Sequence, residues 1–206
     1  MNQAIQFAAP DDREELARAE IYGLLAQLFY APPPAELYEQ LRVAVTVAPA
    51  PGAFLESSWT ELVGASRRLG REQVAAEYDA LFQGLGKPEV FLYGSHHLAG
   101  ALNEKPLVAL RDSLAALGLA RAPGMPETED HIAYLCETMR YLIAGDDAGV
   151  SNLASQRRFF DAHVRGWVDA MCAQIAAHPT ADFYRSLSLF AQGFFSVEAQ
   201  AFDMLD

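Results

Sequence analysis

The residues best suited to chemistry lie within positions 126–143, which read PETEDHIAYLCETMRYLI. Glu129, Asp130 and His131 are consecutive there, and Glu127 stands two positions earlier. Carboxylates beside an imidazole could bind a metal or move protons in a hydrolase, and they could equally cap a helix. The first two functions need further ligands from another part of the chain, and the sequence does not indicate which residues would supply them.

A helix from Glu127 to Ile143 is predicted to place this acidic cluster in its first turn. Carboxylates there interact favourably with the exposed backbone amides of the turn. The sequence leaves the pKa of His131 open, because the carboxylates favour the charged imidazole and a helix N-terminus disfavours it. The apolar residues of the segment recur at helical spacing and are expected to face inward: Ile132, Leu135, Met139 and Leu142.

Other candidate motifs do not indicate catalysis. The segment GLGK at residues 84–87 lacks the earlier glycine and the following Ser or Thr of a phosphate-binding loop. His96 and His97 are adjacent, so they cannot chelate a metal as an i, i+4 pair on a helix would. His163 lies on an apolar helical face and is expected to be a hydrogen-bonded core residue. We therefore expect no metal, no cofactor and no enzymatic activity.

Composition indicates a soluble globular protein. The chain has 206 residues, of which 51% are hydrophobic, enough to bury a substantial core. With 27 acidic and 15 basic residues, the formal charge of −12 argues against a nucleic-acid partner. Cys136 and Cys172 are isolated, which favours a reducing compartment over a disulfide framework. The opening residues resemble no secretion signal, and no run of about 18 apolar residues occurs, so we expect a cytoplasmic protein without membrane insertion.

Helical periodicity dominates the chain, so we predict an all-α fold with residues 1–206 in a single domain. An N-terminal helical part is expected over about residues 12–83 and a C-terminal helical part over about residues 106–206. The connection 84–105 contains four glycines, at positions 84, 86, 94 and 100, and is expected to act as a long hinge.

The predicted helices cover roughly residues 12–29, 34–45, 59–69, 71–82, 106–117, 127–143, 151–177 and 179–201. A capping box of Asp12 and Glu15 opens the first helix, and Leu16 is expected on its buried face. Pro49 and Pro51 mark a loop after the second helix.

Four segments occur in an order that is found in one known family. They are YDALFQG at 78–84, ETEDH at 127–131, the aromatic and histidine run from Phe159 to Trp167, and the aromatic stripe that begins at Phe183. Together they resemble the TorD/DmsD (NarJ-like) family of cytoplasmic chaperones for molybdenum-containing redox enzymes, over roughly residues 15–202. The chain departs from the family pattern at Thr128, where proline is frequent, and at FLYGS in 91–95, which replaces a proline-rich segment.

The resemblance implies a helical bundle of the TorD type. It also implies a chaperone that binds the twin-arginine signal peptide, and often the body, of a molybdenum-containing oxidoreductase in its apo-form until the cofactor is inserted. Such a peptide is cationic at the front and apolar behind, so its receptor needs acidic groups beside an apolar groove. The loop 93–106 suggests a formate dehydrogenase as the client.

The peptide-binding residues implied by the resemblance come from two parts of the chain. Core packing is the competing interpretation of the aromatic and apolar members, and it weighs most for Leu81 and Phe82, which lack the polar tip of a tyrosine. The full set is Tyr78, Leu81, Phe82, Tyr93, Glu129, Asp130 and His131.

Two other functions stay open from the sequence. One is an assembly factor that recognises a folded, non-exported redox subunit, in which case an isolated signal peptide would not bind. The other is a helical metal-dependent enzyme built on Glu127, Glu129, Asp130 and His131, for which stoichiometric metal in the purified protein would be the evidence.

The long connection 84–105 generates a prediction about oligomeric state. Because it is long and contains glycines, the two helical parts can exchange between protomers, and we expect a monomer and a domain-swapped dimer in slow equilibrium. Size-exclusion chromatography with light scattering, on fresh and on incubated samples, measures this equilibrium. A single species under every condition would contradict the prediction.

Overall fold

The structure is a computed structural model that describes residues 10–46, 55–84 and 86–205, with the side chains of residues 10–13 left out. No β-strand is present in these ranges, which confirms the all-α prediction, and one isolated antiparallel bridge pairs Tyr93 with His131. The elements are α1 Pro10–Tyr30, α2 Ala35–Val43, α3 Glu56–Arg68, α4 Arg71–Tyr78, the π-helix η1 Asp79–Gln83, α5 Gly94–Ala99, α6 Lys105–Ala116, α7 Ile132–Ala144, α8 Leu153–His163, α9 Val168–Ala177 and α10 Phe183–Asp203.

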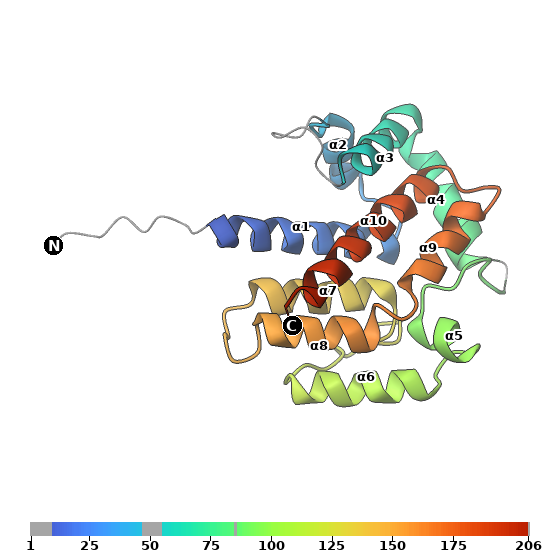
Figure 1. The fold of residues 1–206 in the computed structure, drawn as a ribbon. Coiled ribbons are helices and arrows are strands. Elements are labelled where there is room, and N and C mark those ends of the chain that lie inside the picture. Colours follow the sequence, from blue (N-terminus) through green and yellow to red (C-terminus); the bar gives the residue numbers. More distant parts are fainter. Residues whose placement is uncertain (1–9, 47–54, 85, 206) are drawn as a thin grey trace.

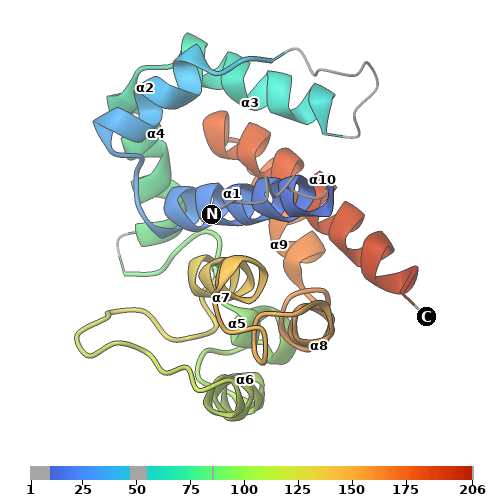
Figure 2. The same cartoon turned by 90° about the vertical axis from the view of Figure 1, so that its left-hand side faces the viewer.

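Helices from the two ends of the chain are packed against each other (Figure 1). The most extensive contact joins α1 to α7, and α10 packs on α9, α3 and α4. On the side of α7 away from α1 lie α8 and then α6, and Figure 2 shows the connection from α6 to α7 as a long loop beside α7. The expected hinge contains the short helix α5, and Val90 and Leu92 within it are buried. The division into two helical parts about this connection stays a prediction.

The apolar face of α7 predicted from the sequence is buried. Ile132, Leu135, Met139 and Leu142 are all at most 1% exposed, because helical spacing brings them to one side. The buried residues of α1 include Tyr22, Leu25, Ala26, Leu28 and Phe29, of which Tyr22 packs on Phe194 of α10.

The start of α1 differs from the prediction. The helix begins at Pro10 rather than Asp12, and the Asp12 side chain of the expected capping box lies outside the described atoms. Leu16 was expected on the buried face but is 57% exposed, because the helical repeat places it on the side of α1 opposite to the buried Leu25. The second helix ends at Val43, and the expected loop at Pro49 and Pro51 lies outside the described residues.

A buried ion pair ties α1 to α10. Arg18 donates to both carboxylate oxygens of Glu198, from Nε at 2.6 Å and from Nη2 at 2.8 Å, and Glu198 is 2% exposed. The hydroxyl of Tyr22 donates to the same carboxylate at 3.0 Å, and Arg18 also donates to Gln156 of α8 at 3.1 Å. A buried carboxylate must be paired and hydrogen-bonded, so this network specifies how the three helices meet.

The single helix predicted over 151–177 is broken into α8 and α9 at residues 164–167. Trp167 donates from Nε1 to the carbonyl of His163 at 2.7 Å, a hydrogen bond that spans the break. Gly166 lies within the break and lowers the cost of leaving the helical conformation. His163 is half-buried and lies 2.8 Å through Nε2 from the Ser113 hydroxyl, so it is hydrogen-bonded at the edge of the core.

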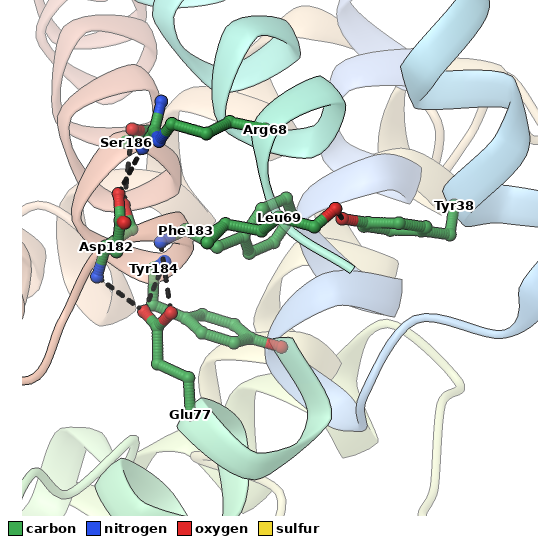
Figure 3. Close-up of polar contacts among 8 residues, drawn as sticks. All are labelled: Tyr38, Arg68, Leu69, Glu77, Asp182, Phe183, Tyr184 and Ser186. Atoms are coloured by element: carbon green, nitrogen blue, oxygen red, sulfur yellow. Dashed lines mark hydrogen bonds and ion pairs between the residues drawn. The ribbon is translucent and has the colours of Figure 1, made fainter. Parts of the chain in front are cut away.

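The last helix begins at Phe183 rather than near Pro179, and its start is capped from another helix (Figure 3). The carboxylate of Glu77 on α4 accepts hydrogen bonds from the amides of Asp182 at 2.8 Å, Phe183 at 3.1 Å and Tyr184 at 2.8 Å. Arg68 of α3 pairs with the Asp182 side chain. A carboxylate at a helix N-terminus satisfies orphan amides and the helix dipole, so Glu77 fixes α4 against α10.

The packing of α7 generates a prediction with a matched control. Leu135→Ala should lower the free energy of unfolding by about 2 to 5 kcal/mol, because it truncates a fully buried side chain. Leu16→Ala makes the same change on an exposed helical position and should cost less than about 0.5 kcal/mol. Chemical denaturation of both variants measures the two values. Equal losses would contradict the burial of Leu135 and the exposure of Leu16.

Candidate functional site

A groove runs along α7, bordered by α1 on one side and by the loop 117–131 and the end of α6 on the other. One hollow of about 300 Å³ lies between α7, the end of α6 and the loop 117–131, and a second of about 190 Å³ lies between α7 and α1. The two share Met125, Tyr134 and Glu137, so they form one continuous surface, which we term the α7 groove. Its lining residues are Ala26, Gln27, Tyr30, Leu114, Leu119, Ala120, Arg121, Ala122, Met125, Glu129, Ala133, Tyr134, Glu137, Thr138 and Tyr141.

The chemistry of the α7 groove is apolar with carboxylates at its edge. Tyr134, Glu137 and Tyr141 recur at helical spacing on α7 outside its buried stripe, and the ring of Tyr134 packs on Tyr30 of α1. Met125, which is flexible and polarisable, lines both hollows from the loop. The carboxylates of Glu129 and Glu137 complete a surface suited to a ligand that is apolar in one part and cationic in another.

The predicted residue Asp130 does not line this groove and instead joins two elements by hydrogen bonds. It is 3% exposed, and its carboxylate accepts from the backbone amide of Ser95 at 2.8 Å and from the Thr128 hydroxyl at 2.6 Å. The amide of Gly94 donates to the Asp130 carbonyl at 3.0 Å, and the amide of Ile132 donates to the Leu92 carbonyl at 2.8 Å. Asp130 therefore fastens the start of α5 to the start of α7.

This joint corrects the prediction for the acidic cluster. The helix begins at Ile132, not Glu127, so Glu127, Glu129 and Asp130 lie in the preceding loop and not in a first turn. The acidic residues do not cap α7 as the sequence pattern predicts. The Asp130 carboxylate instead accepts a hydrogen bond from the Ser95 backbone amide of α5, an element distant in the sequence.

His131 caps α7 itself and is buried. Its Nδ1 accepts from the amide of Ala133 at 3.2 Å, and its side chain is packed among Tyr30, Tyr93 and Tyr134. Burial lowers the pKa of His131 to about 4, and the neighbouring Asp130 opposes that shift only in part. The imidazole is therefore neutral at neutral pH, and it acts as a hydrogen-bond acceptor rather than as a charged ligand.

Glu129 is the member of the predicted cluster that faces the groove. Its carboxylate accepts from Nη2 of Arg111 at 2.9 Å and lies 3.9 Å from Nε of Arg121. The hydrogen bond from Arg111 lowers the pKa of Glu129 below its usual value, so the side chain is ionised at neutral pH.

Tyr93 connects the 84–105 segment to the loop before α7. Its half-buried hydroxyl donates to the carboxylate of Glu127. Burial and this hydrogen bond raise the pKa of Tyr93, so it remains a donor at every physiological pH.

Tyr78, Leu81 and Phe82 lie in the core, away from the lining of the α7 groove. The hydroxyl of Tyr78 donates to the backbone carbonyl of Tyr30 at 2.6 Å, which holds the end of α1 beside the groove. Leu81 is fully buried, and its carbonyl accepts from the amides of residues 89 and 90 at 3.0 Å each. Their peptide-binding role stays a prediction, and in this conformation they position other residues.

No constellation of three or more histidine, cysteine or acidic side chains is arranged for a metal within the described residues. The adjacent histidines have structural contacts: His97 lies 2.8 Å through Nε2 from the Phe91 carbonyl and stacks on Trp167, and His96 stacks on Phe91. None of the helices in the described ranges is long and apolar enough to cross a bilayer.

The sequence interpretation missed Tyr134, Glu137 and Tyr141. That interpretation used only the inward-facing apolar residues of α7, and it assigned no role to the residues on the outer face of the helix. Two aromatic residues and one carboxylate at i, i+3 and i+7 on the outer face of an amphipathic helix were the available signal, because aromatic side chains on such a face indicate a contact surface.

Comparisons with known proteins agree on one family. Residues 49–173, more than half of the chain, match the family model described as nitrate reductase delta subunit. The chain is 27% identical over 209 residues to the chaperone protein TorD of Vibrio cholerae serotype O1, a match that covers 91% of this chain and 93% of that protein. Its fold is similar to a crystal structure described as a candidate redox enzyme maturation protein from Archaeoglobus fulgidus, with a TM-score of 0.59, 15% identity and coverage of 95% and 99% of the two chains.

The burial of His131 generates a prediction about pH. Its folded pKa of about 4 lies below the ordinary value of 6.5, so the unfolded chain takes up the proton first. The stability due to the neutral imidazole is complete above pH 6.5 and is lost as pH falls towards 4, by about 3 kcal/mol in total. His131→Asn keeps a capping acceptor but does not titrate, so its free energy of unfolding should fall less over this range.

Denaturant unfolding of both proteins at a series of pH values between 7 and 4 measures the difference. The remaining histidines and carboxylates are common to both and cancel in the comparison. Parallel pH dependences of wild type and variant would contradict the burial of a neutral His131.

Proposed function

The chain belongs to the nitrate reductase delta subunit family of redox-enzyme maturation chaperones, and on that premise we propose that it binds the twin-arginine signal peptide of a molybdenum-containing oxidoreductase. The bound enzyme would be in its apo-form, and the chaperone would hold it in the cytoplasm until the cofactor is inserted. The relatives are named as chaperones and maturation proteins rather than as catalysts, so a metal-dependent enzyme built on the acidic cluster is set aside.

The observation that carries the proposal is the α7 groove, where apolar side chains and carboxylates share one surface. A twin-arginine signal has a cationic front followed by an apolar segment. The apolar segment fits the aromatic and methionine side chains, Met125, Tyr134 and Tyr141, and the arginines fit the carboxylates of Glu129 and Glu137. The net charge of −12 favours the approach of a cationic peptide.

The predicted binding residues take two kinds of role in this proposal. Glu129 contacts the peptide directly, and Tyr93 supports the loop from behind through Glu127. Asp130 and His131 set the position of that loop and of the start of α7. Tyr78 holds the end of α1 that borders the groove, Phe82 packs on Tyr78, and Leu81 is buried in the core.

The client is proposed as a formate dehydrogenase on the resemblance of residues 93–106 alone. An assembly factor for a non-exported redox subunit is the second candidate, favoured by the description of the family as a nitrate reductase subunit. It differs in its ligand, because it would recognise a folded surface and would not bind an isolated signal peptide.

The role of Glu129 generates a prediction about binding. Glu129→Gln should weaken the binding of a synthetic twin-arginine signal peptide about fivefold, since one charge-assisted contact of about 1 kcal/mol is lost. The thermal midpoint should change little, because the arginines that pair with Glu129 are each more than a third exposed. Binding should also weaken as salt rises.

Isothermal titration calorimetry at two salt concentrations measures these effects. Glu39→Gln is the matched control, because Glu39 is an exposed carboxylate of α2 that is paired with Arg42. Full-strength binding by Glu129→Gln would place the peptide elsewhere, and no binding by the wild type would favour the assembly factor.

A further inference from the structure

The carboxylates of the α7 groove are already matched by arginines of the same chain. Glu129 accepts from Arg111 of α6 at 2.9 Å and lies 3.9 Å from Arg121 of the loop. Glu137 pairs with Arg140, one turn further along α7, at 2.8 Å. A peptide that brings its own arginines into the groove must therefore replace an existing ion pair or share a carboxylate with it.

Arg121 lines the groove and is hydrogen-bonded to the loop that borders it. It is one of the residues that line the first hollow, and its side chain is 38% exposed. Its Nη1 donates to the backbone carbonyls of Met125 at 3.1 Å and Glu127 at 2.9 Å, so the guanidinium lies across the loop that carries both groove residues. Arg111 approaches the same carboxylate from α6, with its side chain 49% exposed.

We propose that Arg111 and Arg121 act as an internal substitute for the ligand's arginines. They pair with Glu129 until the two arginines of a peptide displace them. This inference rests on the proposed function, and it assigns regulation to the same site. Two guanidinium groups converge on one carboxylate, which is the arrangement that two consecutive arginines of a signal peptide would offer.

Displacement has a consequence for selectivity. Because the existing ion pair must first be broken, a peptide that is merely cationic gains only about fivefold in affinity, or about 1 kcal/mol, from its contact with Glu129. Most of the net gain must come from the apolar segment that packs on Met125, Tyr134 and Tyr141. The internal pair thereby excludes basic peptides without an apolar segment, which are abundant competitors for an acidic protein.

An alternative role for Arg121, bracing the loop, predicts the opposite change in peptide affinity. If its hydrogen bonds to residues 125 and 127 serve mainly to brace the loop, removing the guanidinium would loosen the groove and weaken binding. Competition and bracing therefore predict changes of opposite sign in affinity for the same substitution.

The test is calorimetric titration of the full chain with a synthetic peptide of two arginines followed by about 15 apolar residues. Arg111→Gln and Arg121→Gln should each bind the peptide about threefold more tightly than wild type, and the double variant about tenfold, with the largest effect at low salt. Arg42→Gln, which removes an exposed arginine from its pair with Glu39 on α2, should leave the affinity unchanged. A second peptide with two arginines and no apolar segment should bind only the double variant.

The outcomes separate this inference from the proposed function. Wild-type binding that is unchanged or weaker in the double variant overturns the internal substitute and leaves peptide binding intact. Binding by the double variant and not by the wild type supports the inference in its strongest form. Binding by neither protein overturns the proposed function and this inference with it.

Discussion

The arrangement of the site depends on one buried carboxylate, that of Asp130. At 3% exposure it must be hydrogen-bonded to remain in place, and it accepts from the Ser95 amide and the Thr128 hydroxyl. Backbone bonds on either side of it, from Gly94 to the Asp130 carbonyl and from Ile132 to the Leu92 carbonyl, complete the joint. These hydrogen bonds hold the 84–105 segment, the loop before α7 and the start of α7 together. The loop and α7 in turn form the wall of the groove.

One face of α7 packs in the core, and the other lines the groove. The inner face is buried among the neighbouring helices, which holds α7 in place, and the outer face carries Tyr134, Glu137 and Tyr141 into the groove. Polar contacts between distant elements hold the surrounding frame: Arg18 with Glu198 between α1 and α10, and Glu77 at the start of α10. A binding surface on a rigid helix needs less ordering when a ligand arrives, which favours affinity.

The sequence was sufficient for the helical class and for the inner face of α7, because both follow from periodicity alone. The sequence did not predict the places where a hydrogen-bond partner comes from a distant element and not from neighbouring residues. The acidic run before Ile132 has the pattern of a helix start, yet Asp130 caps α5 instead, and nothing local reveals that partner. The break between α8 and α9 depends on Trp167 bonding back to His163, with Gly166 as the single local signal.

Of the predicted site residues, Glu129 faces the groove, whereas Leu81 and Phe82 are buried, since an aromatic or aliphatic residue on a helical stripe fits a core as well as a ligand surface.

The central claim is that the apolar segment of a client signal peptide lies on the outer face of α7. The most direct measurement is photo-crosslinking with a peptide that carries a benzophenone group within that segment, followed by mass spectrometry of the linked chain. The account predicts linkage to Met125, Tyr134 or Tyr141. Linkage instead to Leu24, Trp59 or Phe190, which line a separate apolar hollow between α1, α3 and α10, would contradict it.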